Sequence, residues 1–414
     1  MKRLIPIMIV AAVALPSCND EPGGSVQPAG AITFGAPVME VETRSTFKDA
    51  LSAGDSFGVL GYCLGYTVGT TEINYSSGSG LWATKRAYCP PSVFFNQCVT
   101  VQQDGTCTYD RNNSAAASGN NPKFWYADGT DLDGSENTNI TGADNYRYTF
   151  FAYYPYDGAF TVDAPADASA AGAPKLKFTM PQTGGNIATA LDHTITPDAM
   201  LAALYNRRNS EGNLQFSFRH VLTGLGFVVN NYSSRNLLID RIELRGTFYK
   251  TLIIDATSGT VSYESPANST YTGTYVVYDH TQGTPEEQQR GGMLLVNDDP
   301  DNATVVSSPS PIGGGHIMLI SGTQSQSLGP DNQNLQVYIR YKFWDKDVDE
   351  PADWKEATPT RSATFTFRSG TRYVAELDFV GDAFTINFVQ ANNDMWQDGE
   401  ADDDDETNDD IVFE

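Results

Sequence analysis

The stretch LQVYIRYKF, residues 335–343, has the alternation of a β-strand with one buried face. Apolar side chains occupy every second position, and the positions between them carry Gln, Tyr, Arg and Lys. Successive side chains of a strand point to opposite faces, so the apolar set falls on one side of a sheet. The residues predicted to face a core are Leu335, Val337, Ile339 and Tyr341.

Similar short runs recur along the chain, separated by clusters of Gly, Asn, Asp and Pro. They are rich in aromatic and β-branched residues, which strands favour. Many short strands with turn signals predict β-sandwiches, and 414 residues are enough for two of them. The runs are SFGVLGYCLGY, YRYTFFAYYPY, LQFSFRHVLTGLGFVV, NLLIDRIELRG, HIMLISG, ATFTFRSGTRYVAELDF and AFTINFVQ.

One segment, TPDAMLAALYNRR at 196–208, is predicted to be a short helix near the junction of the two sandwiches. Thr196 is suited to the N-cap and Pro197 to the first helical position. The apolar stripe would consist of Met200, Leu201, Leu204 and Tyr205.

The charge balance is strongly acidic, with 26 basic and 51 acidic residues and a net charge of −25. Binding to nucleic acid requires a basic surface, so this balance argues against it. It equally argues against docking on anionic lipid by charge.

The N-terminus has the pattern of an export signal. Lys2 and Arg3 precede an apolar run at 4–15, which is too short to span a membrane as a helix. The LPSC sequence that follows resembles a bacterial lipobox, and CNDEP resembles the surface-export signal of Bacteroidetes lipoproteins. We therefore predict a signal peptide at 1–17 and acylation of Cys18, which would anchor the protein to the outer membrane, facing outward. The alternative is an ordinary secretory signal with an incidental cysteine.

Four further cysteines lie in the first half of the chain. An even number of cysteines in an exported chain predicts two disulfides, with three pairings that the sequence does not distinguish. A zinc site is the alternative, but no pair has C-x-x-C spacing and no histidine lies among them. The candidates are Cys63, Cys89, Cys98 and Cys107.

The sequence contains no recognisable catalytic motif. The four histidines show no metal-pair spacing, and the nucleophile elbow, Walker loop and dinucleotide fingerprint are all missing. DGTDLDGSE at 128–136 lacks the register of a calcium loop and is interpreted as an Asp/Gly turn. We therefore expect no enzyme activity, no cofactor and no metal.

Several motifs, taken in order over residues 31–400, resemble Bacteroidetes fimbrillins. The resemblance begins with a strand, a Thr-Arg pair and a Gly-Asp turn, and continues through an aromatic strand and an F-x-H strand. The matching segments are ITFGAPVMEVETRSTFKDALSAGDSFGVLGY, YRYTFFAYYPY, TPDAMLAA, GNLQFSFRHVLTGLGFVV, GGHIMLISGTQSQ, LQVYIRY, FRSGTRYVAELDF and MWQDGE.

This resemblance implies a pilus subunit with two transthyretin-like β-sandwich domains, exported as a lipoprotein. A trypsin-like protease would cut between Arg44 and Ser45, and a strand from a neighbouring subunit would replace the strand removed. Loss of residues 32–43 would expose unpaired backbone groups and an apolar groove. Arg44 is otherwise a surface arginine at a strand end.

The predicted organisation has five parts: the signal peptide, a flexible tether at 18–30, sandwiches at 31–195 and 196–397, and a tail at 398–414. In the tail, an acidic block at 402–410 precedes the apolar tip Ile411–Phe413. The donated strand is predicted to be either AFTINFVQ or this tip. An acidic block is a poor insert for an apolar groove, so the tail departs from the pattern of a shaft subunit.

The sequence is compatible with three roles in a pilus: a shaft subunit, a tip or accessory subunit, or an uncleaved anchor. The cysteines and the acidic tail favour a tip or accessory subunit at the cell surface. The expected partners are other pilus subunits, the outer membrane through acyl chains, and a host or bacterial surface ligand. The alternative function is a surface lipoprotein that binds glycans for an importer. It would require an exposed aromatic platform, for which the candidates are FWYADG at 124–129, Trp354 and Trp396.

Overall fold

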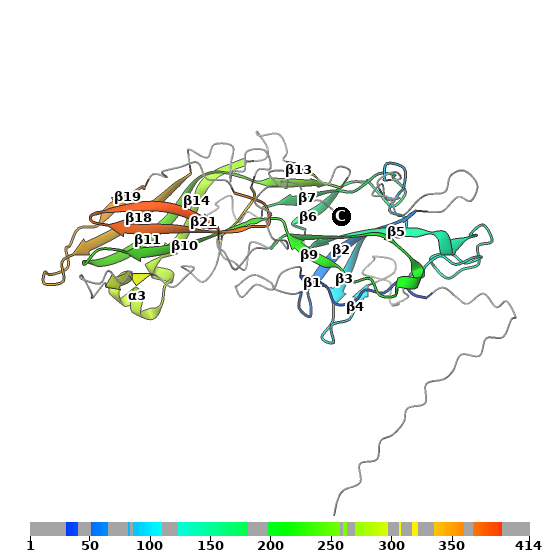
Figure 1. The fold of residues 1–414 in the computed structure, drawn as a ribbon, viewed down its shortest axis with the longest axis horizontal. Helices are drawn as coiled ribbons and strands as arrows, with labels where there is room; N and C mark the ends of the chain where they lie inside the picture. Colours follow the sequence, from blue (N-terminus) through cyan, green and yellow to red (C-terminus); the bar gives the residue numbers. More distant parts are fainter. Residues whose placement is uncertain are drawn as a thin grey trace, which may run out of the picture.

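In the part of the chain that the structure describes, the computed structural model contains two β-sandwiches and the short α-helix α3, which confirms the predicted all-β tandem fold. The sandwiches lie end to end in an elongated molecule (Figure 1). Among the described residues no helix is long and apolar enough to cross a membrane. The structure describes residues 30–39, 51–64, 82, 86–109, 123–156, 158–180, 198–256, 260–262, 270–296, 306–307, 317–321, 335–359 and 367–390.

The N-terminal sandwich pairs a seven-stranded sheet, ordered β1-β9-β8-β5-β2-β3-β4, with a four-stranded sheet, ordered β13-β12-β7-β6. The larger sheet consists of β1 (Val38–Met39), β2 (Ser56–Leu64), β3 (Phe94–Val101), β4 (Cys107–Tyr109), β5 (Arg147–Tyr154), β8 (Met200–Arg207) and β9 (Ser217–His220). The smaller consists of β6 (Phe160–Ala164), β7 (Lys175–Thr179), β12 (Thr251–Asp255) and β13 (Thr260–Ser262).

The C-terminal sandwich is built from two five-stranded sheets, and β10 and β20 pair in parallel in the first of them. The first sheet contains β10 (Thr223–Asn231), β16 (Val306–Ser307), β17 (Ile317–Leu319), β20 (Arg372–Val380) and β21 (Ala383–Gln390). The second contains β11 (Asn236–Tyr249), β14 (Thr270–Asp279), β15 (Met293–Val296), β18 (Gln336–Trp344) and β19 (Lys355–Ala357). The helix α3 (Pro285–Arg290) and the 3-10 turns η1 (Ala143–Asn145), η3 (Asn209–Glu211) and η4 (His280–Gln282) complete the described elements.

Three apolar cores fill the molecule. The C-terminal core lies between the two sheets of the C-terminal sandwich and includes Val337, Ile339 and Tyr341 of β18, as the alternation in LQVYIRYKF predicts. The inner core lies between the two sheets of the N-terminal sandwich, around Phe151 and Phe178. The outer core lies on the opposite face of the seven-stranded sheet and includes Ile32, Phe34, Phe57, Phe94, Trp125, Phe150 and Phe216. The seven-stranded sheet is therefore buried on both faces.

The predicted helix at 196–208 is wrong, because this segment forms strand β8. Met200, Ala202 and Leu204 pack into the outer core, while Leu201 packs into the inner core on the other side of the sheet. Since both faces of β8 are covered, its apolar residues do not alternate with polar ones, and the continuous run imitates a helical stripe. The short helix of the fold is α3, where Thr284 caps the helix and Pro285 opens it.

Strand pairing crosses the predicted boundary between residues 195 and 196. Strand β8 pairs with β5, and β12 pairs with β7 although β12 follows β11 of the other sandwich. Strand β17 also serves both parts, since Ile317 and Leu319 lie in the C-terminal core and Met318 lies in the inner core. The chain thus passes between the sandwiches repeatedly.

The segment 367–371 runs beside the crossing from β9 to β10 and is bonded to it. The hydroxyl of Ser369 donates to the carbonyl of Val221 at 2.6 Å, and the N–H of Gly370 donates to Leu222 at 3.1 Å. The hydroxyl of Thr223 donates to the carbonyl of Arg368 at 2.8 Å. Backbone and side-chain hydrogen bonds therefore tie the segment before β20 to the β9–β10 crossing at the junction.

Candidate functional site

The candidate site is the groove that holds residues 30–39 against the outer core. Ile32 is 0% exposed and Phe34 is 3% exposed, so this segment closes the core. Phe34 forms a parallel bridge with Leu214, and the short strand β1 continues the contact along β9. The groove walls are residues 123–125 on one side and 213–218 on the other.

Backbone hydrogen bonds hold the segment on both sides. Towards 123–125, the N–H of Ile32 donates to the carbonyl of Lys123 at 2.7 Å, and the N–H of Trp125 donates to the carbonyl of Gly30 at 3.2 Å. The bonds towards β9 are Leu214 N–H to Thr33 carbonyl, Gly35 N–H to Leu214 carbonyl and Val38 N–H to Phe216 carbonyl, each 2.9 Å. The segment therefore satisfies backbone groups that its removal would leave unpaired.

Phe34 is the main apolar anchor of the segment. Its ring stacks on Phe216, with centroids 5.8 Å apart and an interplanar angle of 20°. It also meets Phe94 at 5.7 Å, Tyr109 at 5.5 Å and Phe57 edge-on at 6.4 Å. Burial of such a side chain contributes about 1.5–3 kcal/mol, so Phe34 and Ile32 supply much of the attachment.

Two side chains of β4 bind the backbone of the segment. The hydroxyl of Tyr109 donates to the carbonyl of Ile32 at 2.6 Å and accepts the N–H of Lys123 at 3.1 Å. The thiol of Cys107 lies 3.4 Å from the carbonyl of Gly35 and donates to it. Burial raises the pKa of Tyr109 well above its ordinary value and the pKa of Cys107 to about 11, so both groups stay protonated donors at neutral pH.

The regular strand within the segment is short. Only Val38 and Met39 form β1, and Pro37 before them has no N–H to donate. Val38 is 43% exposed, in contrast to Ile32 and Phe34. The segment is therefore held chiefly at its buried N-terminal half.

The predicted processing and lipidation residues, Cys18, Arg44 and Ser45, lie outside the described residues. The strand that cleavage would remove, 32–43, is described as far as Met39.

The four candidate disulfide cysteines are thiols in the structure rather than disulfides. Cys63 lies on β2 opposite Tyr148 of β5, and burial raises its pKa to about 12. Cys98 lies on β3, and Cys107 lies on β4 next to the groove. Among the residues that the structure describes, no cluster of three or more His, Cys, Asp and Glu side chains is suited to a metal ion.

The carboxylates of the predicted turn at 128–136 accept hydrogen bonds from the protein. Asp133 accepts the N–H of Ser135 at 2.8 Å, which is the local bond that Asp makes in turns. Asp131 accepts the side-chain amide of Asn137 at 3.0 Å, and Asp128 accepts the N–H of Ala143 at 2.8 Å. The last two bonds tie the turn to the residues that follow it.

The aromatic platform predicted at 124–129 is wrong for its tryptophan. Trp125 is 3% exposed and packs edge-on against Tyr148, with centroids 4.7 Å apart, inside the outer core. Trp354 is partly exposed, and Trp396 lies outside the described residues. Sequence reasoning missed residues 123–125 as a groove wall. The sequence signal for this wall was three consecutive aromatic residues, 124–126, because such a run is typical of buried extended chain.

No family model matches the chain. It is 21% identical over 412 residues to the fimbrium subunit Fim1C of Phocaeicola vulgatus, covering 95% of this chain and 96% of that protein. A fimbrial protein from Bacteroides vulgatus shares the fold, with a TM-score of 0.55 and 19% identity over 88% of this chain and 99% of its own. The structure of a putative cell adhesion protein from Bacteroides ovatus matches with a TM-score of 0.43 and 14% identity, and the match covers 90% of this chain and 100% of that chain.

Proposed function

We propose, from the confirmed resemblance of this chain to Bacteroidetes fimbrillins, that it is a structural or adhesive subunit of a surface pilus and assembles by strand exchange. The observation that carries this function is the seating of residues 30–39. An apolar segment closes a core at the edge of a sheet, yet only two of its residues form a regular strand.

Export places the subunit at the cell surface in this proposal. Acylation of Cys18 would anchor it in the outer membrane, and residues 18–30 would tether the first sandwich. Cleavage after Arg44 would then release the anchor and the segment 30–39 together. The groove would be left with the pockets of Ile32 and Phe34 open and with unpaired backbone along β9.

The structure narrows the choice of donated strand, because AFTINFVQ is already used. This segment is β21, which pairs with β20 along its whole length, and its Phe384 and Ile386 are buried in the C-terminal core. Its donation would open the core of its own subunit.

The tip Ile411–Phe413 is the donor in our proposal. Its Ile-x-Phe spacing repeats that of Ile32 and Phe34, and alternate residues of a strand point to the same face. An inserted tip would therefore present the same two side chains to the groove. The acidic block at 402–410 would be a solvated spacer between neighbouring subunits. A subunit that both accepts and donates a strand has neighbours on both sides, which favours a position within the pilus over a position at its tip.

The mature N-terminus tests the processing step. Intact mass and terminal peptide mapping of protein taken from the cell surface should show a chain that begins at Ser45. A chain that still begins at acylated Cys18 would keep its own strand and would overturn the proposal. The variant Arg44→Gln should retain Cys18 and should not form pili.

Strand exchange is tested on a chain that begins at Ser45. A synthetic peptide of residues 400–414 should bind it and raise its thermal stability. The control peptide carries Ile411→Asp and Phe413→Asp and should bind neither the chain that begins at Ser45 nor the uncleaved protein. Equal binding of both peptides, or of neither, would contradict the tip as donor.

A further inference from the structure

We propose that the outer face of β11, β18 and β19 binds a neutral saccharide, with Trp354 as the stacking surface. On β18, Tyr338, Arg340 and Lys342 alternate with the core residues and point away from the C-terminal core. This face belongs to the C-terminal sandwich and contains no residue of the groove.

Trp354 is held over two cations. The Arg340 guanidinium lies 5.0 Å from the ring centroid and the Lys342 ammonium lies 4.3 Å from it. Part of Trp354 remains exposed although it is fixed by these contacts. A flat, partly exposed ring of this kind is suited to the apolar face of a sugar, which would otherwise stay in contact with water.

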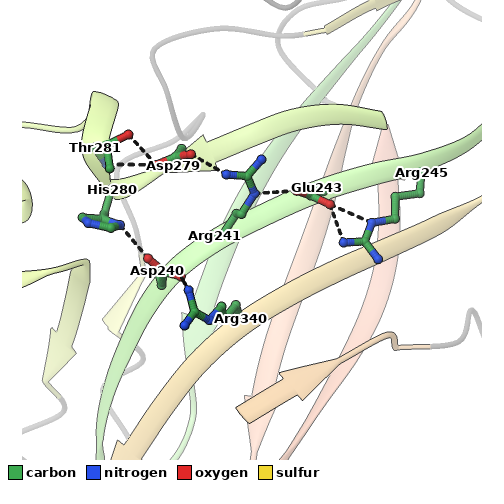
Figure 2. A network of polar contacts seen from close by, with 8 residues as sticks. All are labelled: Asp240, Arg241, Glu243, Arg245, Asp279, His280, Thr281 and Arg340. Carbon is green, nitrogen blue, oxygen red and sulfur yellow. Dashed lines mark hydrogen bonds and ion pairs between the residues drawn. The ribbon is translucent and has the colours of Figure 1, made fainter. Parts of the chain in front are cut away.

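The polar groups beside the ring are fixed by a network that Figure 2 shows. Asp240, which is 4% exposed, lies 2.7 Å from Arg340 and 2.5 Å from Nδ1 of His280. The second cation at Trp354, Lys342, lies 3.1 Å from Glu350. Donors and acceptors thus stand near the ring in defined positions, which lowers the ordering cost of binding.

A second group of ion pairs lies beside the first along β11 (Figure 2). Glu243 is 6% exposed and pairs with Arg241 and Arg245, whose Nε donates to it at 2.7 Å. The Arg245 guanidinium lies 3.7 Å from the centroid of Tyr338 on β18. Two aromatic rings on this face therefore each carry an ordered cation.

Charge selects the ligand class. The ion pairs of this face contain equal numbers of cations and carboxylates: Arg241, Arg245, Arg340 and Lys342 with Asp240, Glu243, Asp279 and Glu350. Glu356 of β19 lies opposite Arg340 and adds a further carboxylate to this face, and the whole chain has a net charge of −25. An acidic ligand would be repelled by the chain and would find each cation already paired. A neutral ligand with many hydroxyls can use donors and acceptors together.

The test is isothermal titration calorimetry on the uncleaved protein. The probes are neutral oligosaccharides of glucose, mannose and galactose, with hyaluronan oligosaccharides as the acidic comparison. We expect at least one neutral probe to bind with a Kd of about 1 mM or tighter. Trp354→Ala should weaken that binding about tenfold or more, and Trp354→Phe should restore most of it. The matched control Tyr88→Ala removes a side chain that is 77% exposed outside this face and should change nothing.

Three results would overturn the proposal: no neutral probe binds, hyaluronan binds more tightly than every neutral probe, or Trp354→Ala binds as the unmodified chain does. Circular dichroism of each variant checks that the sandwich is folded. The experiment needs neither cleavage nor assembly, so its failure is distinguishable from failure of strand exchange.

Discussion

The outer core and the C-terminal core are both closed by an apolar segment at the edge of a sheet, but the two closures differ in kind. Strand β21 pairs with β20 along its whole length and alternates buried with exposed residues. Residues 30–39 bury Ile32 and Phe34 as deeply, yet form regular strand only at Val38 and Met39. The two closures therefore bury apolar side chains to the same degree but differ in the length of regular strand, and in the function that we propose only residues 30–39 are exchanged.

The largest effect is expected in the permanent closure. Phe384→Ala should lower the free energy of unfolding by about 3–5 kcal/mol, because it leaves a cavity in the C-terminal core. Urea denaturation of the purified protein measures this. A loss smaller than that of Phe34→Ala would reverse the comparison.

Phe34→Ala should cost less, about 0.5–3 kcal/mol. Its cost is limited by the free energy of detaching residues 30–39, since the rest of the sandwich stays folded once the segment has left. Hydrogen exchange should show faster exchange at Ile32 and Leu214, whose N–H groups make the groove bonds, and little change in β21. Equal exchange in both regions would mean that the segment does not open locally.

Alkaline pH should loosen the exchangeable closure. Burial raises the pKa of Cys107 from 9.0 to about 11, so the attached state favours the protonated thiol. Its contribution is complete below pH 9 and is lost as the pH rises through 11. Limited proteolysis at Arg44 should therefore accelerate across this interval. In Cys107→Ser the acceleration should be smaller, and an identical pH profile would exclude the thiol.

The smallest effect is expected at β1 itself. Val38→Ala should change stability by no more than about 0.5 kcal/mol, because this side chain is 43% exposed. Thermal unfolding measures it beside Phe34→Ala. A larger loss at Val38 would mean that the C-terminal half of the segment holds it in place.

Strands with one buried face could be predicted from their alternation. Of the strands covered on both faces, the aromatic-rich β5 was still predicted from its composition, whereas β8 was not. LQVYIRYKF alternates because β18 has a core on one side and the charged network on the other. TPDAMLAALYNRR does not alternate because β8 is covered on both sides, and that second cover depends on residues 30–39, far away in sequence.

The site shows the same limit. Residues 32–43 were predicted to cover an apolar groove, whereas the groove wall at 123–125 was interpreted as part of an exposed aromatic platform. Trp125 is buried only because the chain folds back over it, and composition does not contain that information. The cysteine count likewise predicts bonds that depend on distances between strands, and the structure holds thiols at those positions.

The repeated crossings between the sandwiches have a mechanical consequence. Tension that pulls the two sandwiches apart would not act on a single linker, because the β9–β10 and β11–β12 connections both pass between them and β17 packs into a core of each. The bonds from residues 368–370 to 221–223 also tie the start of β20 to the β9–β10 connection. Separating the halves would require shearing these segments together, so a fibre built from such subunits should resist stretching at the middle of each subunit and yield first at the exchanged strand.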